Sequence, residues 1–171
     1  MNYLTLLADT ENNDQISING KTGALLSTAM ACEIMQMVIK QSLNKFYGLS
    51  DIQFMKFWDE LQQLKVDFTI LNNVLKEDLN SIYFLKDKAY LCKRVYRIGL
   101  ILKSNSNSLL STDLSIAINL AKVSLDGLVS ILKNNLNLIE NSTLKKELES
   151  HIEILAKEDE FHQKIMNSPD Y

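Results

Sequence analysis

The feature that most constrains this chain is its lack of helix-breaking residues. Its single proline is Pro169, and only five glycines occur among its 171 residues. Proline and glycine interrupt helices more strongly than any other residues, so long helices can run through most of the sequence. Hydrophobic residues make up 46% and charged residues 23%, which are ordinary values for a globular protein. The composition therefore predicts an all-α chain.

Apolar residues recur at steps of three and four, which places them on one face of a helix. The first long helix is expected from about Thr22 to Phe46, with Gly48 where a helix-ending glycine belongs. Ser50 and Gln53 then form a capping-box pattern that starts a second helix, expected to continue unbroken for many turns. The apolar positions of this second pattern are Phe54, Phe57, Trp58, Leu61, Leu64, Phe68, Leu71, Leu75, Leu79 and Ile82.

Three further helices are expected in the second half of the chain. They span about 86–103, from Ser111 or Thr112 to about 139, and from Leu144 through Phe161, and the polar stretches "SNSNS" and "ENST" separate them. A short helix is also expected near residues 3–9. The predicted fold is one domain over residues 1–171, an up-and-down antiparallel bundle of about five long helices.

Charge and termini narrow the classes of function. A net charge of -3 argues against a general nucleic-acid binder, which needs a clustered basic surplus. The N-terminus lacks the pattern of a signal peptide, and no window is expected to reach the length of a membrane span. Cys32 and Cys92 form no Cys-x-x-Cys pair and lie in apolar helical contexts, which favours reduced core thiols. We expect a cytoplasmic protein that does not bind membranes or nucleic acid.

Gly20, Lys21 and Thr22 match the last three residues of the nucleotide-binding P-loop pattern. The full pattern needs a glycine where Gln15 stands and a buried strand before it, and neither is present in the sequence. A glycine-rich turn into a helix still offers unpaired N–H groups, and Lys21 adds positive charge, so an anion could dock there. The alternative is a simple helix N-cap formed by Thr22.

Two other groups of residues raise functional alternatives. His151 and His162 each follow a glutamate by one helical turn, which favours solvated ion pairs, and one helix without a convergent ligand set is not expected to bind a metal. The third long helix is basic, which is typical of a solvated face but could also attract a polyanionic ligand. Its basic residues are Lys86, Lys88, Lys93, Arg94, Arg97 and Lys103.

Two segments carry a resemblance to a known family. "NGKTGALLSTAMACEIMQMV" at 19–38 aligns without a gap to a Gly-Gly-Gly-Ser-Val-Ala-Ala turn that leads into a small-residue helix. "STDLSIAINLAKVSLDGLVSILKNNLNLI" at 111–139 resembles a Ser-Asp-x-Gly-x-Ala-Ala stretch with a late Ile-Asn-Leu. Both patterns are those of the formiminotransferase-cyclodeaminase family, which includes methenyltetrahydrofolate cyclohydrolases. The chain resembles a divergent member of it.

The resemblance implies a function and a site. It implies a cyclodeaminase-like bundle that acts on formimino- or methenyl-tetrahydrofolate, with a tetrahydrofolate derivative as substrate and no metal. Asp113 corresponds to the acid/base or pterin-orienting residue. The implied substrate-binding residues are Gly20, Lys21, Thr22, Gly23, Asp78 and Asn135.

The chain also departs from the family's pattern. Asn19 and Lys21 replace two loop glycines, Ile18 replaces a proline, and Ser115 replaces the glycine after the Ser-Asp pair. Lys122 replaces an acidic residue, and Ile131 replaces an asparagine. The substrate loops are altered more than the helical frame. The alternative is therefore a non-catalytic dimeric helical paralogue that serves as a binding or structural module.

The family assembles as homodimers, and the first long helix offers a reason for the same assembly here. Small residues allow close approach of a second helix, and methionines are adaptable apolar contacts. Burial of the same face within one subunit is the alternative, which the sequence leaves open. The residues concerned are Ala24, Ser27, Thr28, Ala31 and Cys32, together with Met30, Met35 and Met37.

Overall fold

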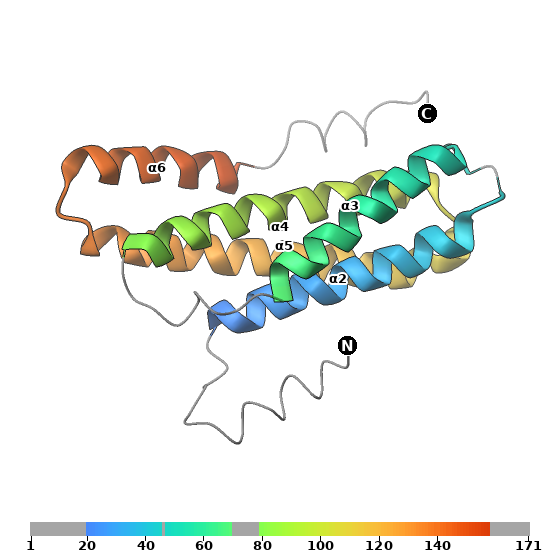
Figure 1. Cartoon of the computed structure of the whole chain (residues 1–171), viewed down its shortest axis with the longest axis horizontal. Helices are drawn as coiled ribbons and strands as arrows, with labels where there is room; N and C mark the ends of the chain where they lie inside the picture. Colours follow the sequence, from blue (N-terminus) through green and yellow to red (C-terminus); the bar gives the residue numbers. More distant parts are fainter. Residues whose placement is uncertain (1–19, 46, 70–78, 158–171) are drawn as a thin grey trace, which may run out of the picture.

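The structure is a computed structural model that describes residues 20–45, 47–69 and 79–157. These residues form an up-and-down helical bundle in which successive helices run in opposite directions (Figure 1). No strand occurs in the described ranges, so the predicted all-α bundle of about five long helices is confirmed. The helices are α2 (Gly20–Ser42), α3 (Asp51–Thr69), α4 (Leu79–Asn105), α5 (Ser111–Asn135) and α6 (Ser142–Ala156), with single 3-10 turns at Ser108–Leu110 and Leu136–Leu138.

The antiparallel pair of α2 and α5 is central to the bundle. α2 packs most extensively against α5 and α3, and α5 also packs along α4, while α6 lies on the outer side of α4 and α5. The backbone N–H of Asn107, just before α5, donates to the Ser42 hydroxyl at the end of α2 over 3.2 Å. Met35 of α2 and Ile118 of α5 both approach Gly99 of α4. Residues 35 and 118 therefore lie at the same level of the bundle.

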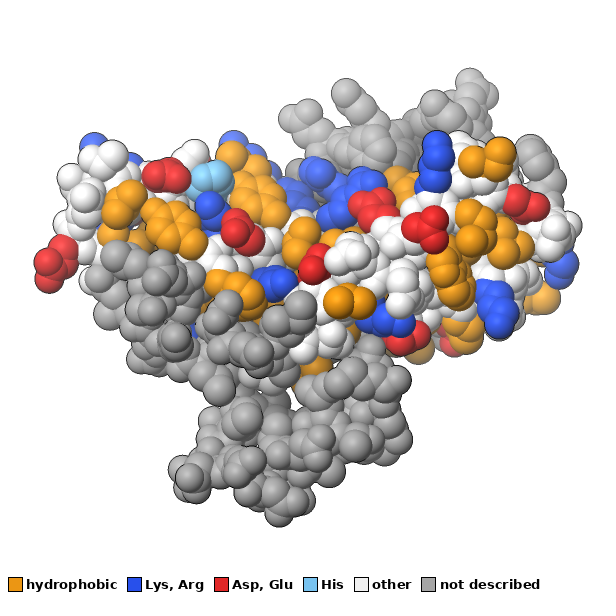
Figure 2. Space-filling model, viewed as in Figure 1, with side chains coloured by type: hydrophobic (Ala, Val, Ile, Leu, Met, Phe, Trp, Pro, Cys, Tyr) orange, Lys and Arg blue, Asp and Glu red, His pale blue; other side chains and the backbone are white. Residues whose placement is uncertain are grey.

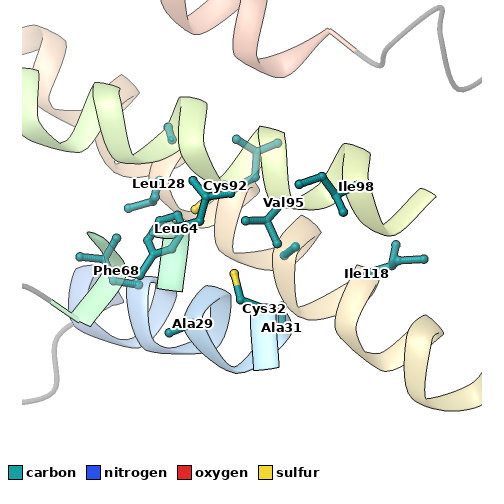
Figure 3. Packing of buried hydrophobic residues seen from close by; sticks show 14 of the residues in the cluster. Ala29, Ala31, Cys32, Leu64, Phe68, Cys92, Val95, Ile98, Ile118 and Leu128 are labelled. Carbon is teal, nitrogen blue, oxygen red and sulfur yellow. The ribbon is translucent and has the colours of Figure 1, made fainter. Parts of the chain in front are cut away.

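The core contains both cysteines. Cys32 on α2 and Cys92 on α4 lie between the helices with Leu64 and Val95 nearby (Figure 3). Both thiols are free and buried, which confirms the predicted reduced core thiols. Burial raises the pKa of each thiol from 9.0 to about 12. Thr28 Oγ1 lies 3.1 Å from Cys92 Sγ, so a polar contact links α2 to α4 at the centre of the core.

The expectation of one unbroken helix through Ile82 is wrong. α3 ends at Thr69 and α4 begins at Leu79, and Ile82 belongs to α4. Phe68 and Ile82 are both buried in the same core. The reversal lets both helices cover the α2 and α5 pair, whereas a single rod would leave part of its apolar face in water. Residues 70–78, which include Leu71 and Leu75, lie outside the described part of the chain.

The connection from α2 to α3 begins earlier in the sequence than expected. α2 ends at Ser42, before the expected Phe46, and the chain turns through Asn44 at φ 61° and Gly48 at φ 105°. The capping box is confirmed, because the Gln53 N–H donates to Ser50 Oγ at 3.3 Å and the Ser50 N–H donates to Gln53 Oε1 at 2.9 Å. The expected helix at 3–9 and the stretch after residue 157 lie outside the described residues.

Two helical stretches are more apolar than the sequence interpretation allowed. Gly20–Ser42 and the stretch Ser108–Asn135 each contain a window with the length and hydropathy of a membrane span, so the expectation that no window reaches that length is wrong. Both belong to the central pair of the bundle, and the buried share of the two windows is 56% and 44%. A helix with neighbours on several sides needs apolar residues around much of its circumference, and so passes the same test without a membrane.

Candidate functional site

The first turn of α2 holds the predicted loop residues. α2 begins at Gly20, so Gly20 to Gly23 are helical and do not form a separate turn. Thr22 is buried inside this first turn, so the N-cap role expected for it is wrong because the helix starts two residues earlier. The first N–H groups of any helix lack intrahelical acceptors, and Gly20 and Lys21 lie at this end of α2. The half-buried Lys21 adds the charge of its amine.

Asp113 occupies the first turn of α5 and is half-buried. Leu110, the residue before α5, gives the helix no side-chain cap. Within the described ranges, Asp113 forms no hydrogen bond or ion pair with another side chain. A carboxylate at this position is stabilised by the positive end of the helix dipole.

The fold separates these two helix starts within one chain. Because α5 runs antiparallel to α2, Asp113 lies near Ser42 at the end of α2 (Figure 1). At 1.5 Å per residue, Ser42 is about 30 Å from Thr22. A single subunit therefore does not bring Asp113 and the start of α2 together, although the resemblance assigns both to one substrate site. Two helix starts can share an end only when the helices run in the same direction.

Asn135 lies at the same end of the bundle as Gly20 to Gly23, because it is the last residue of α5. Its side chain makes no capping hydrogen bond to the following 3-10 turn. Asp78 lies outside the described residues. Of the predicted substrate-binding residues that are described, the structure thus brings Asn135 and the α2 start to one end and leaves Asp113 at the other.

The basic residues of α4 are used inside the subunit. Arg94 Nη2 donates to Glu60 Oε2 on α3 over 2.8 Å, and the pair raises the pKa of Arg94. Lys88 Nζ donates to the Asp67 carbonyl near the end of α3 over 2.6 Å. Burial lowers the pKa of Lys88. Both side chains therefore attach α3 to α4.

Lys93 attaches α6 to α4. Its Nζ donates to the carbonyls of Ile154 and Lys157, at 2.7 and 3.2 Å, where α6 ends. Figure 2 shows blue basic side chains beside red acidic ones on the visible face. The alternative of a basic rim that attracts a polyanionic ligand does not hold for Lys88, Lys93 and Arg94, because neighbouring helices already engage them.

A tyrosine and histidine pair was not predicted. Tyr90 Oη on α4 lies 2.8 Å from His151 Nδ1 on α6, with the rings edge to face at 5.8 Å. Burial raises the pKa of Tyr90. The predicted one-turn pair is confirmed, since Glu147 Oε1 lies 3.9 Å from His151 Nε2, while Glu158 and His162 lie outside the described residues. No local pattern could reveal the Tyr90 contact, because it joins two helices far apart in sequence.

Candidate metal ligands do not gather in the described part of the chain. It contains no group of three His, Cys, Asp or Glu side chains placed to hold a metal ion.

The five described helices and their order define an all-α up-and-down bundle. Among solved structures, the chain is similar to a formiminotetrahydrofolate cyclodeaminase from Thermotoga maritima, with a TM-score of 0.65 and 18% sequence identity. The match covers 89% of this chain and 87% of that one. No protein-family profile and no curated protein sequence matches the chain. At this identity the likeness concerns the fold.

Proposed function

We propose that the chain acts on a folate derivative in one-carbon metabolism, as a cyclodeaminase or cyclohydrolase of formimino- or methenyl-tetrahydrofolate. The observation that carries the proposal is the fold likeness to a formiminotetrahydrofolate cyclodeaminase over nearly the whole length of both chains. The two segments that resemble the family, 19–38 and 111–139, form α2 and α5, the central pair of the bundle. The protein is then a cytoplasmic homodimer with a small-molecule substrate and no bound metal.

Each candidate residue has a role in this proposal. The N–H groups at Gly20 to Gly23 and the Lys21 amine hold anionic or carbonyl groups of the folate. Asn135 lies at the same end and donates or accepts a hydrogen bond, and Asp78 adds an acidic group. Asp113 acts as acid or base, or orients the pterin. Because Asp113 lies at the far end of its own subunit, it has to come from a second copy.

The second candidate is a non-catalytic dimeric module. The separation of Asp113 from the α2 start favours it, because a single subunit holds only part of the candidate site. The replacement of two loop glycines by Asn19 and Lys21 points the same way. In this candidate the helical frame persists and the chemistry is lost.

A titration with methenyltetrahydrofolate separates the two candidates. The proposed enzyme raises its thermal midpoint on binding and consumes the compound, which can be followed by absorbance. Asp113→Asn should abolish turnover with little change in thermal midpoint. Asp126→Asn is the matched control on the same helix, where the carboxylate is exposed and pairs with Lys122 at 2.9 Å. A rise in thermal midpoint without turnover would indicate a binding module. The absence of both effects would indicate a structural module.

A further inference from the structure

The outermost helix, α6, lies against a bundle that is closed without it. α2 packs most extensively against α5 and α3, and α5 packs along α4, so these four helices share one core. Antiparallel packing of four helices around such a core is a complete architecture in itself. α6 contacts the outer side of α4 and α5 (Figure 1). It is therefore an addition to a four-helix core.

The side of α6 that meets the bundle is narrow. Its buried residues are Leu148, Ile152 and Leu155, whose spacing by four and three residues forms a single stripe. Ile154, which lies between two of them in sequence, is 48% exposed. The central helix α5, by contrast, buries residues along its whole length. Because apolar stabilisation scales with the area removed from water, α6 is held far less strongly than α5.

Two side chains of α4 make polar contacts that keep α6 closed. Lys93 Nζ donates to the Ile154 and Lys157 carbonyls at the end of α6, at 2.7 and 3.2 Å. Tyr90 Oη lies 2.8 Å from His151 Nδ1. Tyr90 and Lys93 are three residues apart, so they lie on the same side of α4. Lys93 is only 7% exposed, which is unusual for a lysine, because the end of α6 covers it.

The connection from α5 to α6 has the features of a hinge. Ile139 is buried and fixes the bundle side of the connection, and the backbone at Ile139 and Asn141 is extended. Asn141 Oδ1 accepts from the Thr143 and Leu144 N–H groups, so the cap of α6 belongs to α6 itself. Hinges are a few loop or helix-end residues that absorb a change in φ and ψ. Rotation about residues 139–141 therefore moves the helix with its cap intact.

We propose that α6 is a hinged lid, which opens as a unit about residues 139–141 while α2 to α5 stay folded, and that opening uncovers Lys93 and Tyr90 on α4. An element with few buried contacts opens at a smaller cost in free energy than the core, and it opens cooperatively. α6 therefore controls access to the Lys93 amine. The inference stands apart from the folate proposal, because α6 contains none of the candidate site residues.

Hydrogen exchange of the full chain in low concentrations of urea tests the opening. The hydrogen-bonded amides of α6 should exchange faster than those in the middle of α2, and their rates should rise less steeply with urea, because opening exposes a small area. They should also share one urea dependence, since they open together. Identical rates and urea dependence in α6 and α2 overturn the proposal. A gradient of rates from Ala156 backward also overturns it, because a gradient indicates fraying of the helix end.

A matched pair of variants tests what keeps α6 closed. Ile152→Asn places a polar amide on the buried side of α6, whereas Ile154→Asn makes the same change at an exposed position of the same helix. In Ile152→Asn, exchange across α6 should accelerate about tenfold or more, while α2 and α5 remain protected. In Ile154→Asn, exchange across α6 should change by less than about threefold. Loss of protection in α2 together with α6, or equal effects of the two variants, overturns the proposal.

Acetylation of lysines tests what α6 covers. Lys93 and Lys88 are a matched pair on α4, 7% and 9% exposed, but Lys88 Nζ donates to the Asp67 carbonyl of α3 and not to α6. The full chain is treated with an N-hydroxysuccinimide ester of acetic acid, and each lysine is followed by mass spectrometry of its peptide. In Ile152→Asn, the ratio of Lys93 to Lys88 acetylation should rise about tenfold or more above that of the wild type. An unchanged ratio overturns the proposal, because access to Lys93 would then not depend on α6.

Discussion

At the residue scale, the reversal from α2 into α3 depends on backbone conformations that few residues adopt. Asn44 and Gly48 both have positive φ, 61° and 105°. Asn tolerates its value, whereas the value at Gly48 favours glycine strongly. A Cβ at Gly48 would also lie 2.5 Å from Asn105 Oδ1 at the end of α4. The glycine predicted to end the first helix therefore has its role a few residues later, in the turn.

Gly48→Ala should lower the free energy of unfolding by about 1–3 kcal/mol, because alanine is strained at this φ. Urea unfolding of the two proteins measures the difference. The double variant Gly48→Ala/Asn105→Ala removes the close contact with Asn105 but keeps the backbone strain. The free energy of unfolding of the double variant should therefore still lie below that of Asn105→Ala, by most of the difference between Gly48→Ala and the wild type. If the double variant is as stable as Asn105→Ala, the contact with Asn105, and not the φ angle, causes the loss.

At the element scale, α6 is attached to the bundle by few groups. Leu148, Ile152 and Leu155 bury its apolar side, and Tyr90 and Lys93 of α4 make its polar contacts. Its start could be predicted closely, because Asn141 caps it by accepting from the Thr143 and Leu144 N–H groups. The contacts with α4 could not be predicted, since they depend on which helices become neighbours.

Lys93→Met should loosen the end of α6, because the last carbonyls of that helix lose a charged donor. Hydrogen exchange at residues 152–157 should accelerate, while exchange in the middle of α2 stays nearly unchanged. The control is Lys103→Met, since Lys103 is exposed in the last turn of α4. Equal acceleration in the control, or none in Lys93→Met, would contradict a specific attachment.

Element boundaries show what local patterns can predict. Ser50 and Gln53 predicted the start of α3 because a capping box acts within four residues. The split between α3 and α4 was missed because helical periodicity continues on both sides of a reversal. The exposure of Met30 and Met37, against the complete burial of Ala31, Cys32 and Met35, depends on the positions of α3, α4 and α5 around α2. Periodicity identifies an apolar face, and the neighbours decide how far it extends.

At the scale of the whole molecule, the bundle and the number of helices followed from composition and periodicity, whereas the relative positions of the candidate site residues did not. In the sequence, the starts of α2 and α5 both carry residues that the resemblance assigns to one substrate site. Their separation follows from the up-and-down topology, in which α2 and α5 are antiparallel. A single domain over residues 1–171 stays a prediction, as do the roles of Asp113 and Asn135.

The buried thiols predict how stability depends on pH. Unfolding exposes Cys32 and Cys92, and the pKa of each thiol then falls from about 12 toward 9.0. Above about pH 9 the thiols of the unfolded chain therefore lose protons that the thiols of the folded chain keep. Their contribution is fully present below about pH 9 and is lost as the pH rises toward 12. Urea unfolding between pH 8 and about pH 10.5 should show a steeper decline for the wild type than for Cys32→Ala/Cys92→Ala. Parallel profiles would contradict this origin.

The pairing of α2 with α5 has a consequence for how the protein is made. The ribosome releases α2 first, but its most extensive packing partner is completed only when Asn135 has emerged. α3 can fold back on α2 early, yet the α2 surface that packs against α5 remains uncovered until α5 arrives. The nascent chain therefore exposes an apolar helix through much of its translation, and transiently exposed apolar surface is what makes folding intermediates prone to aggregation.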